Sequence, residues 1–204
     1  MKKLSGKRYE YDIYGLDKRF SLFEERIDNS GELLPENKKL IISFKRRVYA
    51  ASLMGKHRVL KYETFFNNYD SLLQKPFDKA TKEDLEDIVA RVKDNPDWKE
   101  LTKRDFLLLL KRYYKIAAGL EDENEYPDLV KWIKTPKVKE PPIKWDEVPN
   151  WEDICKMADC TLNARDEAFI KSIWEAGTRI GEHLTLRVGD IQETESGLYL
   201  NIWK

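Results

Sequence analysis

The sequence contains only two cysteines and no apolar run long enough to cross a membrane. Cys155 and Cys160 have no second cysteine pair and no histidine nearby, so the spacing does not predict a zinc or other metal site. We expect two free, buried thiols in a reducing compartment. A membrane span needs about 18 consecutive apolar residues, and no apolar stretch follows the basic start as it would in a signal peptide. These absences favour a cytoplasmic protein without a membrane segment.

The formal net charge is zero, but the charges are divided unevenly along the chain. Residues 1–120 contain 26 Lys and Arg against 19 Asp and Glu, whereas residues 121–204 contain 11 against 18. An excess of positive charge in one half indicates that this half meets a polyanion. The acidic second half is less expected for an enzyme that acts on DNA.

Apolar residues at spacings of three and four predict a mainly helical chain. A helix over about 14–27 falls in residues 1–33, which we interpret as an extra helix packed on the first domain rather than an arm. Residues 34–120 form a helical domain, in which Pro35, a capping box at Thr81 and a cap at Thr102 mark helix starts. Residues 121–149 are an extended linker, and 150–204 form a second domain that ends in a strand.

Basic residues gather in two places in the first domain. The segment 38–61 holds eight Lys and Arg and no acidic residue, and the predicted last helix adds a second patch. A solvated charged face is the plain interpretation, but a run without any acid favours contact with phosphate groups. We therefore predict a DNA-binding set made of Lys45, Arg46, Arg47, Lys56, Arg58, Lys61, Lys103, Arg104, Lys111, Arg112 and Lys115.

A tight break between two helices presents one arginine. The helical run 166–176 stops at Gly177, and a short second run follows with Ile180 and Leu184 expected inward. Arg179 lies at the break, where its planar guanidinium can meet a phosphate. Glu182 lies one turn on, where its carboxylate can orient that guanidinium. The plain interpretation is a helix–turn–helix with one surface arginine.

The order of residues in this segment adds a resemblance. WEAGTRIGEHLTLRVGDI, residues 174–191, resembles the first catalytic-arginine box of the tyrosine recombinases, the phage-integrase and Xer family. Its order of residues is most similar to that of archaeal integrases. Nearly every fixed place of the box is filled, and His183 stands where the family usually has leucine.

The resemblance implies a fold and an activity. It implies a SAM-like helical core-binding domain followed by the start of an α+β catalytic domain. It implies site-specific DNA recombination or integration, in which a tyrosine forms a 3′-phosphotyrosine with double-stranded DNA, within a tetramer and without metal or nucleotide cofactor. Arg179 would hold the non-bridging phosphate oxygens, Glu182 would support it, and Lys204 falls on or just before the place of the catalytic lysine.

Three interpretations follow. The family's later motifs, including the nucleophilic tyrosine, do not occur in these 204 residues, so we expect the amino-terminal half of a recombinase that is inactive alone. A naturally shortened or split integrase that only binds DNA is the alternative. A helical protein-interaction domain is a third, but it must explain both the acid-free basic run and the arginine box.

Overall fold

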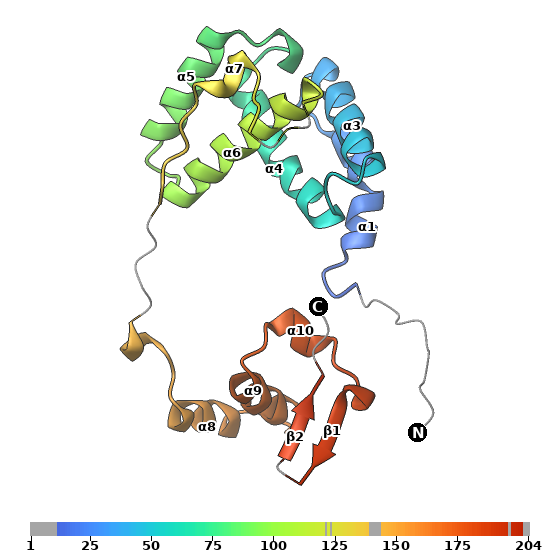
Figure 1. Cartoon of the computed structure of the whole chain (residues 1–204), viewed down its shortest axis with the longest axis vertical. Coiled ribbons are helices and arrows are strands. Elements are labelled where there is room, and N and C mark those ends of the chain that lie inside the picture. The colour runs from blue at the N-terminus through green and yellow to red at the C-terminus, as the bar shows by residue number, and fades with distance from the viewer. Residues whose placement is uncertain (1–11, 121, 123, 139–143, 196, 202–204) are drawn as a thin grey trace. The chain divides into compact units, whose positions relative to one another are not determined.

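The computed structural model describes residues 12–120, 122, 124–138, 144–195 and 197–201, and it is mainly helical. The chain divides into two compact units (Figure 1). One is Gly15–Glu140, here called the helical unit, and the other is Met1–Tyr14 together with Pro141–Lys204, called the C-terminal unit. No helix in the described part of the chain is both long and apolar enough to cross a membrane.

The helical unit begins with two short helices, α1 (Leu16–Ser21) and α2 (Phe23–Asn29), where the sequence predicted one. The helices α3 (Pro35–Ala50), α4 (Lys56–Leu73), α5 (Lys82–Asp94) and α6 (Glu100–Ala117) follow, and α7 (Asp128–Lys131) is a single turn. A 3-10 turn, η1 (Phe77–Lys79), joins α4 to α5.

Local start signals account for most of these bounds. Pro35 occupies the first turn of α3, as predicted, because its missing N–H would have no partner there. The Thr81 side chain accepts a hydrogen bond from the Asp84 N–H, which confirms the capping box. The predicted cap at Thr102 is wrong, since α6 starts at Glu100 and Thr102 lies inside its first turn.

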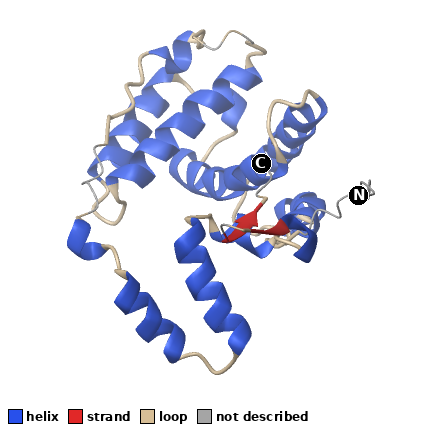
Figure 2. Cartoon of the chain, turned by 60° about the horizontal axis from the view of Figure 1, so that its bottom comes forward, coloured by secondary structure: helices blue, strands red, loops and turns tan. Residues whose placement is uncertain are grey.

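The core of the helical unit is built on α4, which contacts α1, α3, α5 and α6. Figure 2 shows that helices, drawn in blue, make up most of the described chain. Five apolar residues at helical spacing on α4 are buried: Val59, Tyr62, Phe66, Tyr69 and Leu73. Aromatic rings fill the interior. The Phe44 ring lies 4.8 Å from that of Tyr62, and the Tyr69 ring lies 4.7 Å from that of Phe77, centroid to centroid. Such rings bury large apolar areas and supply the main stabilisation of the unit.

Two segments outside residues 34–120 pack into the same core, and the first of them is the extra helix that was expected to pack on this domain. Phe23 and Ile27 of α2 are buried in the core, as are Val130 of α7 and Ile133 just after it. The first half of the predicted linker 121–149 therefore belongs to the helical unit. A 3-10 turn, η2 (Trp145–Glu147), lies in its second half.

The C-terminal unit contains α8 (Trp151–Asp159), α9 (Ala164–Ala176), α10 (Ile180–Leu184) and a 3-10 turn, η3 (Val188–Asp190). The strands β1 (Ile191–Thr194) and β2 (Gly197–Leu200) then form an antiparallel hairpin in which Ile191 pairs with Leu200. The Asn150 side chain caps α8 by accepting a hydrogen bond from the Asp153 N–H.

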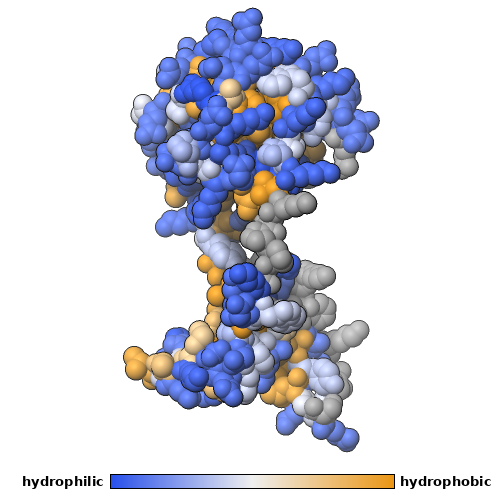
Figure 3. All heavy atoms as spheres, turned by 90° about the vertical axis from the view of Figure 1, so that its left-hand side faces the viewer, coloured by the Kyte–Doolittle hydropathy of each residue, from blue (hydrophilic) through white to orange (hydrophobic). Residues whose placement is uncertain are grey.

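Apolar side chains of this unit lie mostly at its surface, and Figure 3 shows several of them in orange. Among its described residues only Ile154 and Ala158 are buried. The sequence placed Ile180 and Leu184 inward, but their exposed fractions are 56% and 51%, and Met157 of α8 is 54% exposed. The expectation of buried thiols is also wrong, because Cys160 is exposed and Cys155 is half-buried. The helices of this unit are amphipathic, but no described element packs over most of their apolar side chains.

Candidate functional site

The turn between α9 and α10 holds Arg179 at a fixed place. Gly177 ends α9 with a left-handed backbone, φ 59°, which a glycine adopts without steric cost. Arg179 then takes an extended conformation and is the N-cap of α10. Its side chain is 85% exposed, so the guanidinium is directed to solvent from a turn whose backbone is set.

The Glu182 carboxylate contacts Arg179 twice. One oxygen accepts the Arg179 backbone N–H at 2.9 Å, and the other accepts Nη1 of the guanidinium at 3.0 Å. The structure thus brings together the two residues that the sequence paired. Nη2 and Nε of Arg179 have no hydrogen-bond partner within the described ranges. Those two nitrogens lie on one edge of the guanidinium, the edge that a phosphate takes in bidentate contact.

His183 is the residue of this turn that sequence reasoning left without a role. Its Nε2 lies 2.9 Å from the Ser172 hydroxyl of α9, and its Nδ1 lies 3.0 Å from the Thr178 hydroxyl. The Phe169 ring packs edge-on against the imidazole, with centroids 5.3 Å apart. The only signal in the sequence was that a histidine stands where the resemblance expects leucine.

Lys204, the third predicted catalytic residue, lies outside the described residues. The two cysteines and the described histidines, aspartates and glutamates form no group of three or more that could hold a metal ion.

The basic segment 38–61 contains no acidic residue, but acidic residues of other helices contact it in the structure. Glu24 of α2 accepts hydrogen bonds from Lys45 at 3.2 Å and from Arg46 at 2.6 Å, and Arg46 above all lowers the Glu24 pKa. Lys56 bonds to Asp17 of α1, and Lys61 bonds to Asp105 of α6 at 2.6 Å. Acids from other helices therefore partner much of the predicted phosphate-binding set.

Lys45 is the clearest correction within that set. It is only 8% exposed, and its ammonium lies 4.5 Å from the centroid of the Phe20 ring. Cation–π contact and the Glu24 carboxylate together hold it against the protein. Lys45 is therefore unable to meet a phosphate in this arrangement.

Four other cations of the predicted DNA-binding set donate hydrogen bonds to backbone carbonyls in the helical unit. Arg47 donates to the Ile116 carbonyl at 2.8 Å, at the end of α6. Lys103 donates to the Lys93 carbonyl at 2.8 Å, and Lys111 donates to the Ile133 carbonyl at 3.1 Å. Lys115 donates to the Asp122 carbonyl. These hydrogen bonds link the four side chains to the backbone. Because a carbonyl is neutral, each side chain keeps its positive charge.

Three predicted arginines have neither a hydrogen bond nor an ion pair within the described parts of the chain: Arg58 on α4, and Arg104 and Arg112 on α6. Burial raises the pKa of Tyr62, and the positive charges of Arg112 and Arg58 act in the opposite direction. Both positive charges act on this one phenol, Arg58 from α4 and Arg112 from α6. We call Arg58 and Arg112 the arginine pair.

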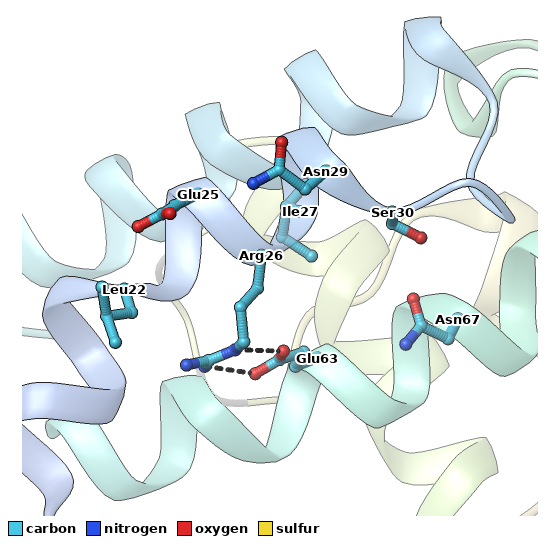
Figure 4. A pocket seen from close by; sticks show the side chains of 8 residues that line it. All are labelled: Leu22, Glu25, Arg26, Ile27, Asn29, Ser30, Glu63 and Asn67. Carbon is cyan, nitrogen blue, oxygen red and sulfur yellow. Dashed lines mark hydrogen bonds and ion pairs between the residues drawn. The ribbon is translucent and has the colours of Figure 1, made fainter.

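A pocket of about 480 Å³ lies between α2 and α4. Figure 4 shows Arg26 and Glu63 facing each other across it, and two hydrogen bonds of 2.7 Å join them. Arg26 and Glu63 neutralise one another, and the exposed Glu25 is the charged group of this lining that has no ion pair among the described residues. Asn67 Oδ1 is its one buried side-chain atom that lacks a partner, counting only the described lining.

Comparison of the chain with protein-family models, with curated proteins and with solved structures finds no match.

Proposed function

We propose that this chain binds double-stranded DNA and contributes Arg179 to a phosphodiester-binding site of the tyrosine-recombinase type. In this proposal the helical unit is the core-binding domain and the C-terminal unit is the start of the catalytic domain. Site-specific strand cleavage and rejoining through a 3′-phosphotyrosine is then the activity of the protein that contains the whole catalytic domain.

The proposal rests on how the turn and Glu182 hold the Arg179 guanidinium. Most exposed arginines sit on solvated helix faces, where many rotamers are available. Arg179 instead leaves a turn that Gly177 and Glu182 define, with one edge of its guanidinium unengaged among the described residues. A preorganised donor is useful where negative charge develops, because it needs no reorganisation during the reaction.

The arginine pair supports the DNA-binding part. Arg58 and Arg112 stand on different helices, their charges act on the same buried phenol, and neither forms an ion pair with an acid within the described ranges. Guanidinium groups in that state attract phosphate, and such contacts set register on the duplex more than sequence choice.

A second candidate function is a DNA-binding module without chemistry, and one observation favours it for these 204 residues. Burial raises the pKa of Tyr62, Tyr69, Tyr113 and Tyr114 in the helical unit, so none of these phenols is a useful nucleophile. Sequencing the gene beyond codon 204 separates a recombinase from a module that only binds.

Salt-dependent binding to a labelled duplex tests the DNA-binding part. For Arg58→Gln with Arg112→Gln, we expect weaker binding and a log–log salt slope smaller by about two, since each phosphate contact contributes about 0.9. The matched control is Lys82→Gln with Lys93→Gln, which removes equal charge from α5. That control should change the slope much less.

Equal losses in the two double variants would mean that only net charge matters, and an unchanged slope in the first would reject the arginine pair as a contact. Lys45→Gln is a further check, because its buried and paired ammonium should contribute nothing to the slope.

For Arg179, the informative protein is one that also contains the nucleophile. Arg179→Ala should leave duplex affinity within a few-fold and reduce strand cleavage by roughly a hundredfold or more. Arg179→Lys should restore little, because an ammonium lacks the two parallel donors. Cleavage of a nicked suicide substrate, read as covalent adduct on a denaturing gel, measures both. Full cleavage by Arg179→Ala would remove this residue from the site.

A further inference from the structure

The imidazole of His183 joins three parts of the C-terminal unit. It stands on α10, contacts Ser172 on α9 through Nε2, and contacts Thr178 in the turn through Nδ1. Thr178 immediately precedes Arg179. A single side chain therefore ties the turn that presents the guanidinium to the helix before it.

The protons of this chain of groups can be placed. Ser172 Oγ lies 2.6 Å from the Ala168 carbonyl and 3.3 Å from that of Phe169, so its one proton is donated to Ala168. Ser172 then accepts from His183, which requires the proton of the neutral imidazole on Nε2. Nδ1 is left as an acceptor, and it takes the hydroxyl proton of Thr178.

We propose that His183 is a positioning residue for Arg179, and that its Nε2–H tautomer links Thr178, Ser172 and the Ala168 carbonyl in one directed series of hydrogen bonds. This inference rests on the proposed function only in giving Arg179 a phosphate to meet. A leucine at this place fills space but offers Thr178 no acceptor. The turn then depends on the Gly177 conformation and the Glu182 contact alone.

Further contacts hold both the ring and the backbone of His183 against the turn. His183 is half-buried, and the Phe169 ring limits its rotation on one side. The His183 N–H also donates to the Arg179 carbonyl at 3.0 Å, so backbone and side chain of His183 act on consecutive residues of the turn.

The test begins on the free 204-residue chain. Nitrogen-15 spectra of the histidine rings at pH 8, where neutral imidazole dominates, should place the His183 proton on Nε2. His57 is an internal control, since it is exposed and has no hydrogen-bond partner within the described ranges, and its two tautomers should average. A proton on Nδ1 of His183, or averaging equal to that of His57, would overturn the proposal.

Three substitutions separate positioning from simple packing. His183→Asn keeps an acceptor near the Nδ1 place, His183→Gln keeps a donor near the Nε2 place, and His183→Leu keeps neither. Exchange of the Arg179 amide should become about tenfold faster in His183→Leu and return close to wild type in His183→Asn. Equal exchange in all variants would overturn the proposal, as would faster exchange in Asn than in Leu.

A second measurement connects the turn to DNA. Adding a short duplex should shift the Arg179 Nε–Hε signal in the wild type and in His183→Asn, and shift it less in His183→Leu. A wild-type signal that does not move counts against the proposed function and leaves the tautomer and exchange results standing. A full shift in His183→Leu overturns the positioning role.

Discussion

Asn37 is fully buried and uses its side chain to join three segments. Its Nδ2 donates to Asp70 at 2.6 Å and to the Lys75 carbonyl at 3.1 Å, and its Oδ1 accepts the Phe77 N–H at 2.8 Å. Removing it leaves buried partners without hydrogen bonds, which costs more than the bonds themselves contribute.

We therefore expect Asn37→Ala to lower the free energy of unfolding by about 3 kcal/mol. Urea denaturation of the chain measures the change. Asn68→Ala is the matched control, because no hydrogen bond of its side chain occurs within the described ranges and the change should stay within about 0.5 kcal/mol. Equal effects for the two variants would show that the network adds no stability.

Two buried tyrosines on the same helix offer a contrasting pair. The Tyr62 hydroxyl has no hydrogen-bond partner among the described residues, whereas the Tyr69 hydroxyl bonds to that of Tyr114, which donates to the Phe77 carbonyl at 2.9 Å. Tyr62→Phe removes an unpaired polar atom and should leave stability unchanged or slightly higher. Tyr69→Phe should cost about 1 kcal/mol. Thermal unfolding of both variants measures the two changes in stability. A larger loss of stability for Tyr62→Phe than for Tyr69→Phe would contradict this assignment.

At the scale of an element, the start of α5 is set by ionised Asp84. Its pKa is lowered to about 2, first by the hydrogen bond from Lys75 and then by the Thr81 N–H and hydroxyl. A lowered folded-state pKa means that the carboxylate stabilises the fold above the unfolded value near 4 and that this contribution is lost as the pH falls through about 2.

A carbon-13 titration of Asp84 tests this directly. Lys75→Met should raise the Asp84 pKa toward 3.8, and Thr81→Ala should raise it by less, because the Lys75 hydrogen bond is the largest cause. The N-cap of α5 should loosen in acid at a correspondingly higher pH in Lys75→Met. An unshifted Asp84 pKa in Lys75→Met would show that this contact is not formed in solution.

At the scale of the whole molecule, the two units differ in how much they bury. In the helical unit α4 alone has eight buried residues, while α9 and α10 in the C-terminal unit have none among the described residues. Local opening is easiest where few apolar side chains are buried. We expect amides of α9 and α10 to exchange at least a hundredfold faster than those of α4 and α6 in native-state hydrogen exchange.

Helix α9 is a useful comparison, because its N-cap Asn163, like Thr81 of α5, accepts a hydrogen bond from a backbone N–H of the first turn. Equal protection of α9 and α4 would mean that a surface in the C-terminal unit is covered in solution. The two units should also unfold separately on heating, since the hydrophobic core cluster of the described residues lies in the helical unit.

The helical content, most helix starts and the turn that presents Arg179 could be predicted from local residue patterns. Pro35, Thr81, Asn150 and Gly177 act within four residues of themselves, through missing donors, side-chain caps and a left-handed backbone. The pairing of Arg179 with Glu182 is equally local, at a separation of three residues. Interactions of that range are fixed by chain geometry, so a sequence pattern predicts them well.

Which charges are paired and which apolar faces are covered could not be predicted in this way, because both depend on contacts between distant segments. Glu24, Asp17 and Asp105 meet the basic run from 21, 39 and 44 residues away, and they change an acid-free segment into a largely paired surface. Ile180 and Leu184 have the spacing of a core face but lie at the surface, because no described element packs over them. Charge pairing and burial depend on which segments fold against each other, and local spacing carries no information about a partner so distant in the chain.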